Sequence, residues 1–502
     1  MSASQTRRGL SKSRLIAWRQ CPRRLWLETY RPELREVDAA AQARFDTGNR
    51  VGELARDLVP GGVLVKYQDD LAQALAVTAE LLRTRPDAPL FEAAFQHDGL
   101  LVRADLLLPG AGQGGHHLVE VKSTAGVKDY YLPDAAIQAW VAERAGLPLG
   151  RVSIGHLDTA FIYPGAGDYT GLFHWEDVTD RIQPLENEVG DWLVAARVVL
   201  QGDQPDIAPG EQCTTPFDCP FQHHCWPEPP ENPVDLLPGK NGKALARQLH
   251  KEGHDDLRQV PEARITEPTL RRIHQATVSG QAYLDPQAAE KLKALGWPRH
   301  YLDFEAAGFA IPVWAGTRPF QALPFQWSCH IQTADGQLRH ADYLETRGEP
   351  PMRPFAESLL TALGEEGPIL VYSPYERRIL NELAQALPDL APSLKAVMDR
   401  LHDLHPLTKA HYYHPAMKGS WSIKAVLPTV APDLDYQALG EVQDGTAAQR
   451  AYGEIIDPAT PEDRRNALIQ DLRDYCRLDT LAMVRLAEFL AQGAGQRPPL
   501  LT

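Results

Sequence analysis

The sequence lacks any apolar run of the ~20 residues that a membrane-spanning helix needs. Its basic N-terminal stretch is not followed by the apolar core and cleavage site of a secretory signal. We therefore expect a cytoplasmic protein with no membrane partner. Its hydrophobic content of 43% and charged content of 23% are ordinary for globular proteins. A chain of 502 residues is long enough for two or three domains.

The chain also lacks a general excess of positive charge, because its formal net charge at pH 7 is -15. Nucleic-acid-binding proteins are often basic, so this balance counts against such a role at first sight. The exception is the N-terminal stretch before Glu28, whose basic residues are Arg7, Arg8, Lys12, Arg14, Arg19, Arg23 and Arg24. Such a local patch either binds phosphates or forms a solvated helix face.

Cysteine is scarce, with six residues in the chain, yet three of them fall within the short stretch "EQCTTPFDCPFQHHCW". These three are Cys213, Cys219 and Cys225. Because cytoplasmic thiols stay reduced, such clustering indicates a metal or redox site and not disulfides. The loop is too polar for these cysteines to be unliganded core residues.

A site with four ligands needs one more thiol. Cys21 is the natural candidate, because Cys329 and Cys476 lie in the other region of the chain. Four thiolates suit either zinc or an iron–sulfur cluster. Zinc ribbons usually show paired C-x2-C knuckles, whereas these cysteines are single and widely spaced. The spacing favours a 4Fe-4S cluster, with zinc as the alternative.

Composition divides the chain into three regions. Residues 1–230 mix helical and strand patterns and end just after the cysteine loop. A linker rich in Pro and Gly and a small helical connector follow over residues 231–285. Residues 286–502 again combine strand-like and helical patterns. We therefore expect an α/β protein with two domains joined by the connector.

Two neighbouring predicted strands carry the first group of charged residues. "LLVRADLLLP" places Asp105 near its middle, and "HHLVEVKST" holds Glu120 and Lys122. Residues two apart in a strand share a face, and a neighbouring strand can bring Asp105 alongside. Two carboxylates can hold Mg2+ or Mn2+, and a lysine beside them can position a water or stabilise charge on a phosphate. A surface hairpin with salt-bridged charges is the alternative explanation.

The order Asp, turn, Glu-x-Lys resembles the motif of the PD-(D/E)XK nuclease superfamily, in its RecB-like branch. The resemblance implies a restriction-endonuclease-like fold in which these three residues are catalytic and the two acids bind metal. It also implies that Glu53, in "FDTGNRVGELARDL", helps to bind metal. Gln138 fits a downstream motif and would contact DNA, although Ala142 stands where the family has Tyr.

The cysteine arrangement resembles that of the iron–sulfur nucleases of the same branch, among them AddB and the CRISPR-associated exonuclease with a cluster. In those families one cysteine precedes the nuclease fold and three follow it. The resemblance implies a structural 4Fe-4S cluster that joins the two ends of the domain, held by Cys21, Cys213, Cys219 and Cys225. Such a cluster would fix three basic residues near the active site for phosphate binding, namely Arg19, Arg23 and Arg24.

A second group of acidic residues lies in the last region. "HYLDFEAAG" is typical of a strand with Asp303 and Glu305 on one face. "GPILVYSPYERRILNEL" indicates strand, turn and helix, with Glu376 at the helix start. Near the end of the chain, Tyr475 and Asp479 lie one turn apart on an amphipathic helix. Four such acids can hold the two metal ions of in-line phosphodiester hydrolysis. Any single motif is equally well explained by a solvated helix face or hairpin.

This set resembles the DEDDy exonucleases of the RNase H-like fold, in the DnaQ-like superfamily. The D-x-E and Y-x-x-x-D motifs imply 3′–5′ exonuclease activity, with Tyr475 orienting the attacking water. Glu376 stands where the family has Asp, and Asp403 is a second candidate metal ligand. "MKGSWSIKAVLP" resembles a stretch in which Lys424 would contact nucleic acid, and a plain turn before a helix is the alternative.

The segments "LSKS" and "CPRRLW", with this layout, resemble a bacterial family of unknown function that joins the two nuclease types. We expect a metal-dependent nuclease with two centres that hydrolyses DNA, as single strands or as ends. The alternatives are a nucleic-acid-binding scaffold with one decayed centre and an RNA-directed nuclease. Repair, recombination and phage defence are equally open as pathways, and no protein partner is indicated.

Overall fold

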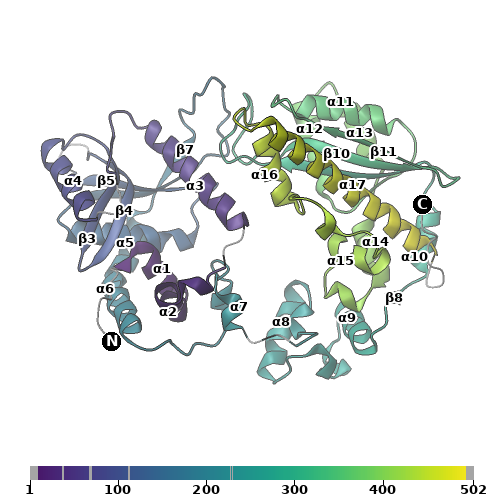
Figure 1. Cartoon of the computed structure of the whole chain (residues 1–502), viewed down its shortest axis with the longest axis horizontal. Helices are drawn as coiled ribbons and strands as arrows, with labels where there is room; N and C mark the ends of the chain where they lie inside the picture. The colour runs from purple at the N-terminus through teal and green to yellow at the C-terminus, as the bar shows by residue number, and fades with distance from the viewer. Residues whose placement is uncertain are drawn as a thin grey trace. The chain divides into compact units, whose positions relative to one another are not determined.

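The computed structural model describes residues 10–36, 39–66, 71–110, 114–226, 228 and 230–492, without the side chains of residues 39–41 (Figure 1). Arg7 and Arg8 of the expected basic patch lie outside these residues. Helices and strands mix along the chain, which confirms the expected α/β class. The chain divides into two compact units, Met1–Pro227 with Phe309–Gln321 and Glu228–Gly308 with Ala322–Thr502.

The first unit is built on one large sheet. Its strands are β1 (Leu10–Ser11), β2 (Val63–Leu64), β3 (Leu90–His97), β4 (Leu100–Leu108), β5 (His116–Lys122), β6 (Leu149–Leu157) and β7 (Phe173–Asp177). They lie in the order β2-β3-β4-β5-β6-β7, with β1 paired to β4. Strands β5 and β6 are parallel, whereas β3, β4 and β5 pair antiparallel. The helices are α1 (Lys12–Gln20), α2 (Pro22–Tyr30), α3 (Ala39–Asp57), α4 (Leu71–Thr84), α5 (Leu132–Arg144), α6 (Thr179–Gln201) and α7 (Gln222–Cys225).

Helix α5 is the crossover that a parallel pair requires, because β5 and β6 cannot be joined by a tight turn. Pro133 stands in its first turn, where a missing N–H is not needed for hydrogen bonding. The alanine-rich buried side, with Ile137, packs closely on the sheet together with residues of α1 and α6. Helix α3 packs through Ala55 on the other face, which carries Leu106 and Val119. The candidate residues of β4 and β5 therefore lie within a covered sheet.

The second unit is built on a five-stranded sheet. Its strands are β9 (Arg299–Ala307), β10 (Leu323–Gln332), β11 (Leu338–Leu344), β12 (Ile369–Val371) and β13 (Leu401–Asp403), in the order β11-β10-β9-β12-β13. A two-stranded ribbon joins β8 (Tyr283–Leu284) to β14 (Tyr412–Tyr413). The helices are α8 (Gly239–Lys251), α9 (Pro268–Ser279), α10 (Gln287–Lys293), α11 (Met352–Leu363), α12 (Tyr375–Ala386), α13 (Ala391–Asp399), α14 (Leu404–His411), α15 (Ile423–Val430), α16 (Gly445–Ile455) and α17 (Glu462–Gln492).

The two faces of this second sheet differ in polarity, as the period of two along a strand allows. Leu302 and Phe304 of β9 face an apolar core that α11, α12 and α13 complete. Asp303 faces the opposite side, which α17 covers and where Gln326 Nε2 donates to the Leu472 carbonyl (2.9 Å). Acidic side chains of β9 are thus held between a sheet and a long helix.

For two segments of the chain, composition does not predict the unit to which they belong. The connector expected over residues 231–285 is part of the second unit and contains α8 and α9. The segment Phe309–Gln321 leaves β9, packs in the first unit and returns to β10. In the first unit, Gly316 N donates to the Tyr163 carbonyl (2.8 Å), and Ala310 packs against Val51 and Leu157.

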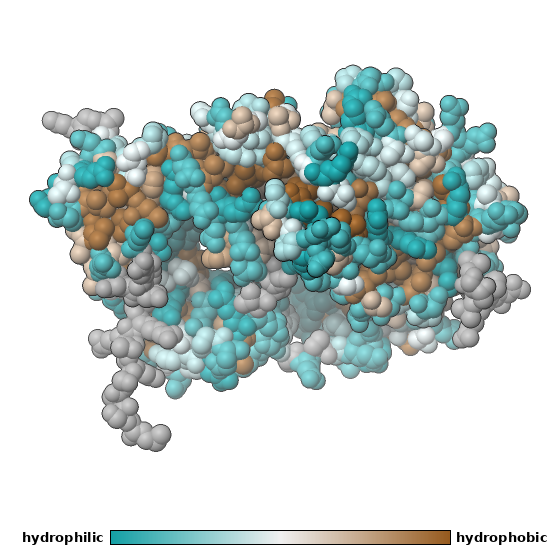
Figure 2. All heavy atoms as spheres, turned by 45° about the horizontal axis from the view of Figure 1, so that its top comes forward, coloured by the Kyte–Doolittle hydropathy of each residue, from teal (hydrophilic) through white to brown (hydrophobic). Residues whose placement is uncertain are grey.

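None of the described helices is both long and apolar enough to cross a bilayer. Figure 2 shows polar side chains over much of the face it draws, with apolar patches between them. Exposed large apolar side chains in the described residues include Phe45, Val194 and Val198. Apolar side chains at a protein surface are normal and by themselves indicate no partner.

Candidate active centres and a four-cysteine pocket

Three carboxylates from two elements meet on the polar side of the second unit's sheet. Asp303 and Glu305 come from β9, and Asp479 comes from the buried side of α17. One oxygen atom from each residue lies within 4.8 Å of the other two. In the described part of the chain, no other group of three His, Cys, Asp or Glu residues meets this spacing. We call these three residues the carboxylate cluster.

The carboxylate cluster is poorly solvated, and its members repel one another. Burial, followed by the charges of Asp479 and Glu305, raises the pKa of Asp303 well above its usual value. Burial and the Asp479 charge raise the pKa of Glu305 to about 8. Burial raises the pKa of Asp479 to about 6, although its hydrogen bonds oppose the change. A bound cation would remove this repulsion, so the cluster fits a divalent metal with oxygen ligands.

Glu376 and Asp403, the two candidates for the middle motif, have different surroundings. Glu376 lies in the first turn of α12, is 2% exposed and accepts a hydrogen bond from Ser373 Oγ (3.2 Å). Its charge raises the pKa of both acids of β9, so it lies near the carboxylate cluster. Asp403 is the N-cap of α14 and accepts a hydrogen bond from the His405 N–H (2.8 Å). Glu376 is therefore the better candidate for a fourth ligand, because capping already accounts for Asp403.

Two tyrosines and a lysine surround Asp479. Tyr475 lies one turn before it on α17, and the Tyr436 hydroxyl donates a hydrogen bond to its carboxylate. Lys424 Nζ lies 5.1 Å from the centre of the Tyr475 ring and 5.2 Å from that of Tyr436. Its charge opposes the rise in the pKa of Glu305 and Asp479. The structure thus brings Tyr475 and Lys424 to the cluster and adds Tyr436, which no local motif indicates.

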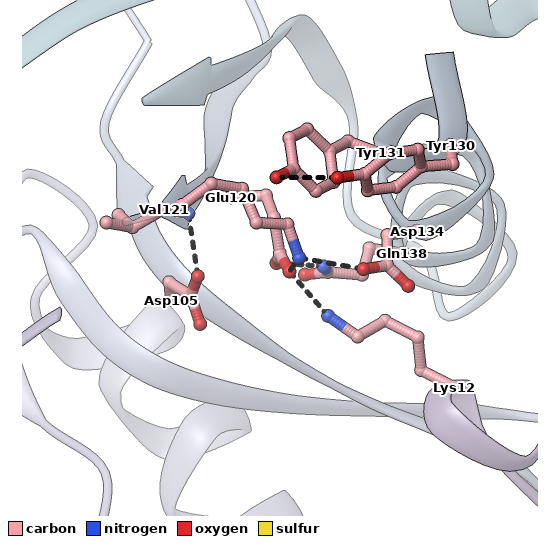
Figure 3. A network of polar contacts seen from close by, with 9 residues as sticks. Lys12, Asp105, Glu120, Val121, Tyr130, Tyr131, Asp134 and Gln138 are labelled. Carbon is pink, nitrogen blue, oxygen red and sulfur yellow. Dashed lines mark hydrogen bonds and ion pairs between the residues drawn. The ribbon is translucent and has the colours of Figure 1, made fainter. Parts of the chain in front are cut away.

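Asp105 and Glu120 lie on neighbouring strands of the first unit (Figure 3). The register pairs Leu106 of β4 with Val119 of β5, which puts Asp105 next to Glu120. Asp105 Oδ2 accepts a hydrogen bond from the Val121 N–H (2.7 Å). Burial and the Glu120 charge raise the pKa of Asp105 to about 7. The hairpin therefore places two carboxylates where a divalent cation could bind.

Glu120 makes the central contacts of this first centre (Figure 3). Its Oε1 atom accepts from Lys122 Nζ (2.8 Å) and from Lys12 Nζ (2.8 Å), and its Oε2 atom accepts from Gln138 Nε2. Lys122 Nζ also donates to Asp134 Oδ2 (2.8 Å). Burial alone would raise the pKa of Glu120, but the two lysine charges hold that pKa well below its usual range. Glu120 is therefore an ionised acid held by three donors.

Three side chains of the first centre lie in places that the sequence did not indicate. Gln138, expected to contact DNA, is fully buried, so its amide orients Glu120 and is closed off from a nucleic acid. Its Oε1 atom has no hydrogen-bond partner in the described structure. Asp134 lies four residues before Gln138 on one face of α5, and this spacing could have identified it. Lys12 reaches the centre through tertiary contacts, for which its local sequence holds no signal.

Glu53, expected as a further metal ligand, is exposed on α3. Val51 and Ala55 are four residues apart and form the buried side of this helix, and Glu53 between them points away from it. This exposed position gives no support to Glu53 as a metal ligand.

The four expected thiols line one pocket of the first unit. Cys21 joins α1 to α2, and the other three lie after α6, with Cys225 ending α7. None of them forms a disulfide. Gln20 Nε2 donates to the carbonyls of Gln212 (2.9 Å) and Phe217 (2.6 Å), which fastens the cysteine loop to the end of α1. The fold therefore joins segments that are far apart in sequence at this thiol pocket.

The thiols of the pocket are close enough to influence one another's ionisation. Burial raises the pKa of Cys219, and the neighbouring Cys213 and Cys21 raise it further against the charge of Arg24. Burial likewise raises the pKa of Cys225. The four cysteines are therefore neighbours within one pocket.

The three arginines expected to bind phosphates are each held by protein groups. Arg23 and Arg24 line the thiol pocket. Arg23 donates to the Ile207 carbonyl (3.3 Å), and Arg24 Nε forms an ion pair with Glu28 (2.9 Å). Arg19 is exposed and stacks on Trp192, 3.9 Å from the ring centre. Two of the three arginines therefore lie beside the thiols.

Comparison with protein families finds a match over part of the chain. Residues 300–422 match the model of a family described as a domain of unknown function (DUF2779). This range contains β9 except its first residue, and it contains Glu376, but it ends before Tyr475 and Asp479. No curated protein and no solved structure matches the chain.

Proposed function

We propose that this protein is a metal-dependent nuclease with two active centres. The observation that carries the proposal is the carboxylate cluster, in which a strand and a distant helix bring three acids within 4.8 Å. Burial of like charges costs free energy, and such clusters concentrate at functional sites. The D-x-E and Y-x-x-x-D residues contribute all three acids, which supports an RNase H-like 3′–5′ exonuclease of the DEDDy type.

In this second centre, the carboxylate cluster would hold Mg2+ or Mn2+, with Glu376 beside it. Such an ion supplies an activated water and neutralises charge on the phosphate. Tyr436 fixes the orientation of Asp479 through its hydroxyl, and Tyr475, one helical turn before Asp479, would orient the attacking water. Lys424 places a positive charge over both rings, where it can attract a backbone phosphate.

The first centre supports a PD-(D/E)XK assignment with a metal held by Asp105 and Glu120. Lys122 is fixed between Glu120 and Asp134, so its ammonium group is positioned to stabilise negative charge on a reacting phosphate. We propose DNA, as single strands or ends, as the substrate. RNA is the alternative substrate, because contacts to phosphate oxygens do not distinguish the two sugars.

The thiol pocket supports a structural 4Fe-4S cluster, with zinc as the alternative. The cysteines are single and widely spaced in sequence, unlike the paired C-x2-C knuckles of zinc ribbons, and a cluster holds its thiolates on separate iron atoms. Arg23 and Arg24 line the pocket and offset the negative charge of thiolates. A visible absorption spectrum of anaerobically purified protein, with iron and zinc analysis, would distinguish the two.

The test of the nuclease proposal uses end-labelled single-stranded oligonucleotides in Mg2+ or Mn2+. Asp479→Asn should reduce stepwise 3′–5′ degradation about a hundredfold or more, because it removes a charged ligand from the centre. Asp474→Asn, an exposed change on the same helix, is the matched control and should cleave as the parent does. Lys122→Ala should remove the remaining cleavage. A double variant of Asp479 and Lys122 that digests all substrates at the parent's rate would contradict the proposal.

One observation favours the scaffold alternative for the first centre. Glu120 already has Lys12, Lys122 and Gln138 as partners, so its charge is compensated without a metal. A decayed first centre would bind no Mn2+ yet still hold DNA. Titration of the Asp479→Asn variant with Mn2+ separates these two cases.

A further inference from the structure

Lys12 is placed at the first centre by backbone structure on both sides of it. Strand β1 pairs in parallel with β4, with Leu10 opposite Leu100 and Ser11 opposite Leu101. Ser11 is then the N-cap of α1, and its side chain accepts a hydrogen bond from the Arg14 N–H (3.4 Å). Lys12 is therefore the first residue of a helix that starts beside the sheet, and its ammonium group lies against Glu120 (Figure 3).

The two lysines at Glu120 are held differently. Lys122 Nζ has two carboxylate partners, Glu120 and Asp134, each at 2.8 Å. Lys12 Nζ has one, since Glu120 is its only acceptor within hydrogen-bond range among the described residues. An anion that enters the centre can therefore draw Lys12 away from Glu120 at the cost of one ion pair, while Lys122 stays with Asp134.

The net charge of the first centre also indicates that Lys12 helps to attract the phosphate. Its three carboxylates are Asp105, Glu120 and Asp134, and its two ammonium groups are Lys12 and Lys122, so the formal sum is -3 + 2 = -1. A divalent cation would change this sum to +1, which matches the single negative charge of a phosphodiester. Without Lys12 the same sum would be zero, and the phosphate would gain no net attraction at the point of reaction.

We propose that Lys12 is a second catalytic lysine of the first centre, which leaves Glu120 and binds a non-bridging oxygen of the scissile phosphate. This proposal rests on the nuclease function proposed above. It assigns separate tasks to the two lysines: Lys122 stays fixed between two acids, and Lys12 follows the substrate. Lysine suits the second task, because its charge sits at the end of a flexible four-carbon chain.

The test uses the Asp479→Asn protein, in which cleavage by the first centre is measured alone under single-turnover conditions. Lys12→Ala should slow this cleavage about a hundredfold, the loss typical of one removed charge-stabilising donor. Lys12→Arg should recover part of the rate, because it keeps the charge. Lys66→Ala, which removes an exposed lysine from the same unit, is the matched control and should cleave as its parent.

Two binding measurements separate a catalytic role from a structural one. In Ca2+, Lys12→Ala should bind a labelled oligonucleotide several-fold more weakly than Lys66→Ala does. Without DNA, Lys12→Ala should bind Mn2+ at least as tightly as its parent, since Glu120 loses a competing ammonium group. A variant that loses Mn2+ binding and melts at a lower temperature would show a purely structural counter-ion and overturn the proposal.

Unchanged cleavage and unchanged oligonucleotide binding in Lys12→Ala would equally overturn the proposal. Failure of the nuclease function itself has a different signature: the Asp479→Asn protein with Lys12 intact would not cleave at all. In that case the comparison of oligonucleotide binding in Ca2+ alone decides whether Lys12 binds phosphate.

Discussion

At Asp303, Glu305 and Asp479, the folded chain holds acidic groups whose pKa values lie above those of the same groups in the unfolded chain. Burial raises all three pKa values, and repulsion by neighbouring acids adds to the increase at Asp303 and Glu305. The pKa reaches about 8 for Glu305 and about 6 for Asp479. A carboxyl group with a raised folded pKa binds its proton more tightly in the folded state. Such a group therefore makes the fold less stable as pH rises from the unfolded pKa, about 4, through the folded pKa.

We expect the metal-free protein to melt at a lower temperature at pH 8 than at pH 5. Asp303→Asn should reduce this dependence on pH, because it removes one of three mutually repelling charges, and Mn2+ should stabilise the parent more at pH 8 than at pH 5. Relief of about 2 kcal/mol corresponds to roughly 4–8 °C in a unit of this size. Scanning calorimetry with and without EDTA measures the effect, with Asp474→Asn as the control. Identical pH profiles for parent and Asp303→Asn would contradict this account.

The residues of the candidate centres differ in how far sequence could predict them. Asp105, Glu120 and Lys122 could be found because strand alternation and a turn put them side by side, and Tyr475 with Asp479 because they lie one helical turn apart. Lys12 and Tyr436 reach the centres through contacts between elements distant in sequence. No local period encodes such contacts, so local patterns alone could not predict them.

At the scale of elements, helix α1 connects two sites. Lys12 at its first residue contacts Glu120, and Cys21 directly after its last residue lines the thiol pocket. Nine residues of helix span about 13 Å, so the helix keeps a fixed distance between these sites. A change at the thiols can therefore move the end of α1 that carries Lys12.

We expect Cys21→Ser to slow cleavage by the first centre about tenfold to a hundredfold, the scale reported for a small displacement of a catalytic group. Cleavage by the second centre, measured in the same sample, should change little and serves as the internal control. Combination with Lys12→Ala should add little to the effect of Lys12→Ala alone. Independent, multiplying losses would show that the thiol pocket does not act through α1.

A surface histidine gives the connector helix α8 its own dependence on pH. His250 lies between Asp255 Oδ1 (2.6 Å) and Asp235 Oδ2 (2.9 Å). Burial lowers the pKa of His250, but the hydrogen bonds and charges of the two aspartates together raise it by more, so the pKa lies above 6.5. Its protonated form therefore stabilises α8 below pH 6.5, and this contribution is lost as pH rises through the folded pKa.

We expect amide protons of α8 to exchange more slowly, relative to the intrinsic rate, at pH 6 than at pH 8. The difference should be below about 1 kcal/mol, because the pair is partly exposed to solvent. His250→Gln should remove it, whereas His254→Gln, at a nearby histidine outside this pair, should leave it unchanged. An equal pH dependence in His250→Gln and parent would exclude this origin.

At the scale of the whole molecule, the α/β class could be predicted from helix and strand patterns, and the structure divides the chain after Pro227, next to the Pro- and Gly-rich segment. The exchange of Phe309–Gln321 between units could not. This segment lies between two strands of the second unit's sheet but contributes to the core of the first unit. The unit in which it packs depends on tertiary contacts alone. Composition indicates local structural preferences only, so it cannot predict the unit in which this segment packs.

We expect a fragment of residues 1–227 to be less stable than the same unit in the intact chain. It lacks Ala310, which packs with Val51 and Leu157, and it lacks the hydrogen bond from the Tyr163 N–H to the Thr317 carbonyl (2.9 Å). The lost burial corresponds to about 2 kcal/mol. Urea denaturation of the fragment, with and without residues 309–321 fused through a flexible linker, measures the difference. Equal stability of the two forms would show that the segment adds nothing.

The excursion of Phe309–Gln321 means that the backbone passes from one unit to the other three times, near residues 227, 308 and 321. A protease that nicks one passage would leave the other two intact. A gene divided after codon 227 would encode two polypeptides, and the second would contain Phe309–Gln321, the segment that packs in the first unit. Co-expression of the halves should then reconstitute what separate expression cannot, which makes this protein suited to fragment complementation.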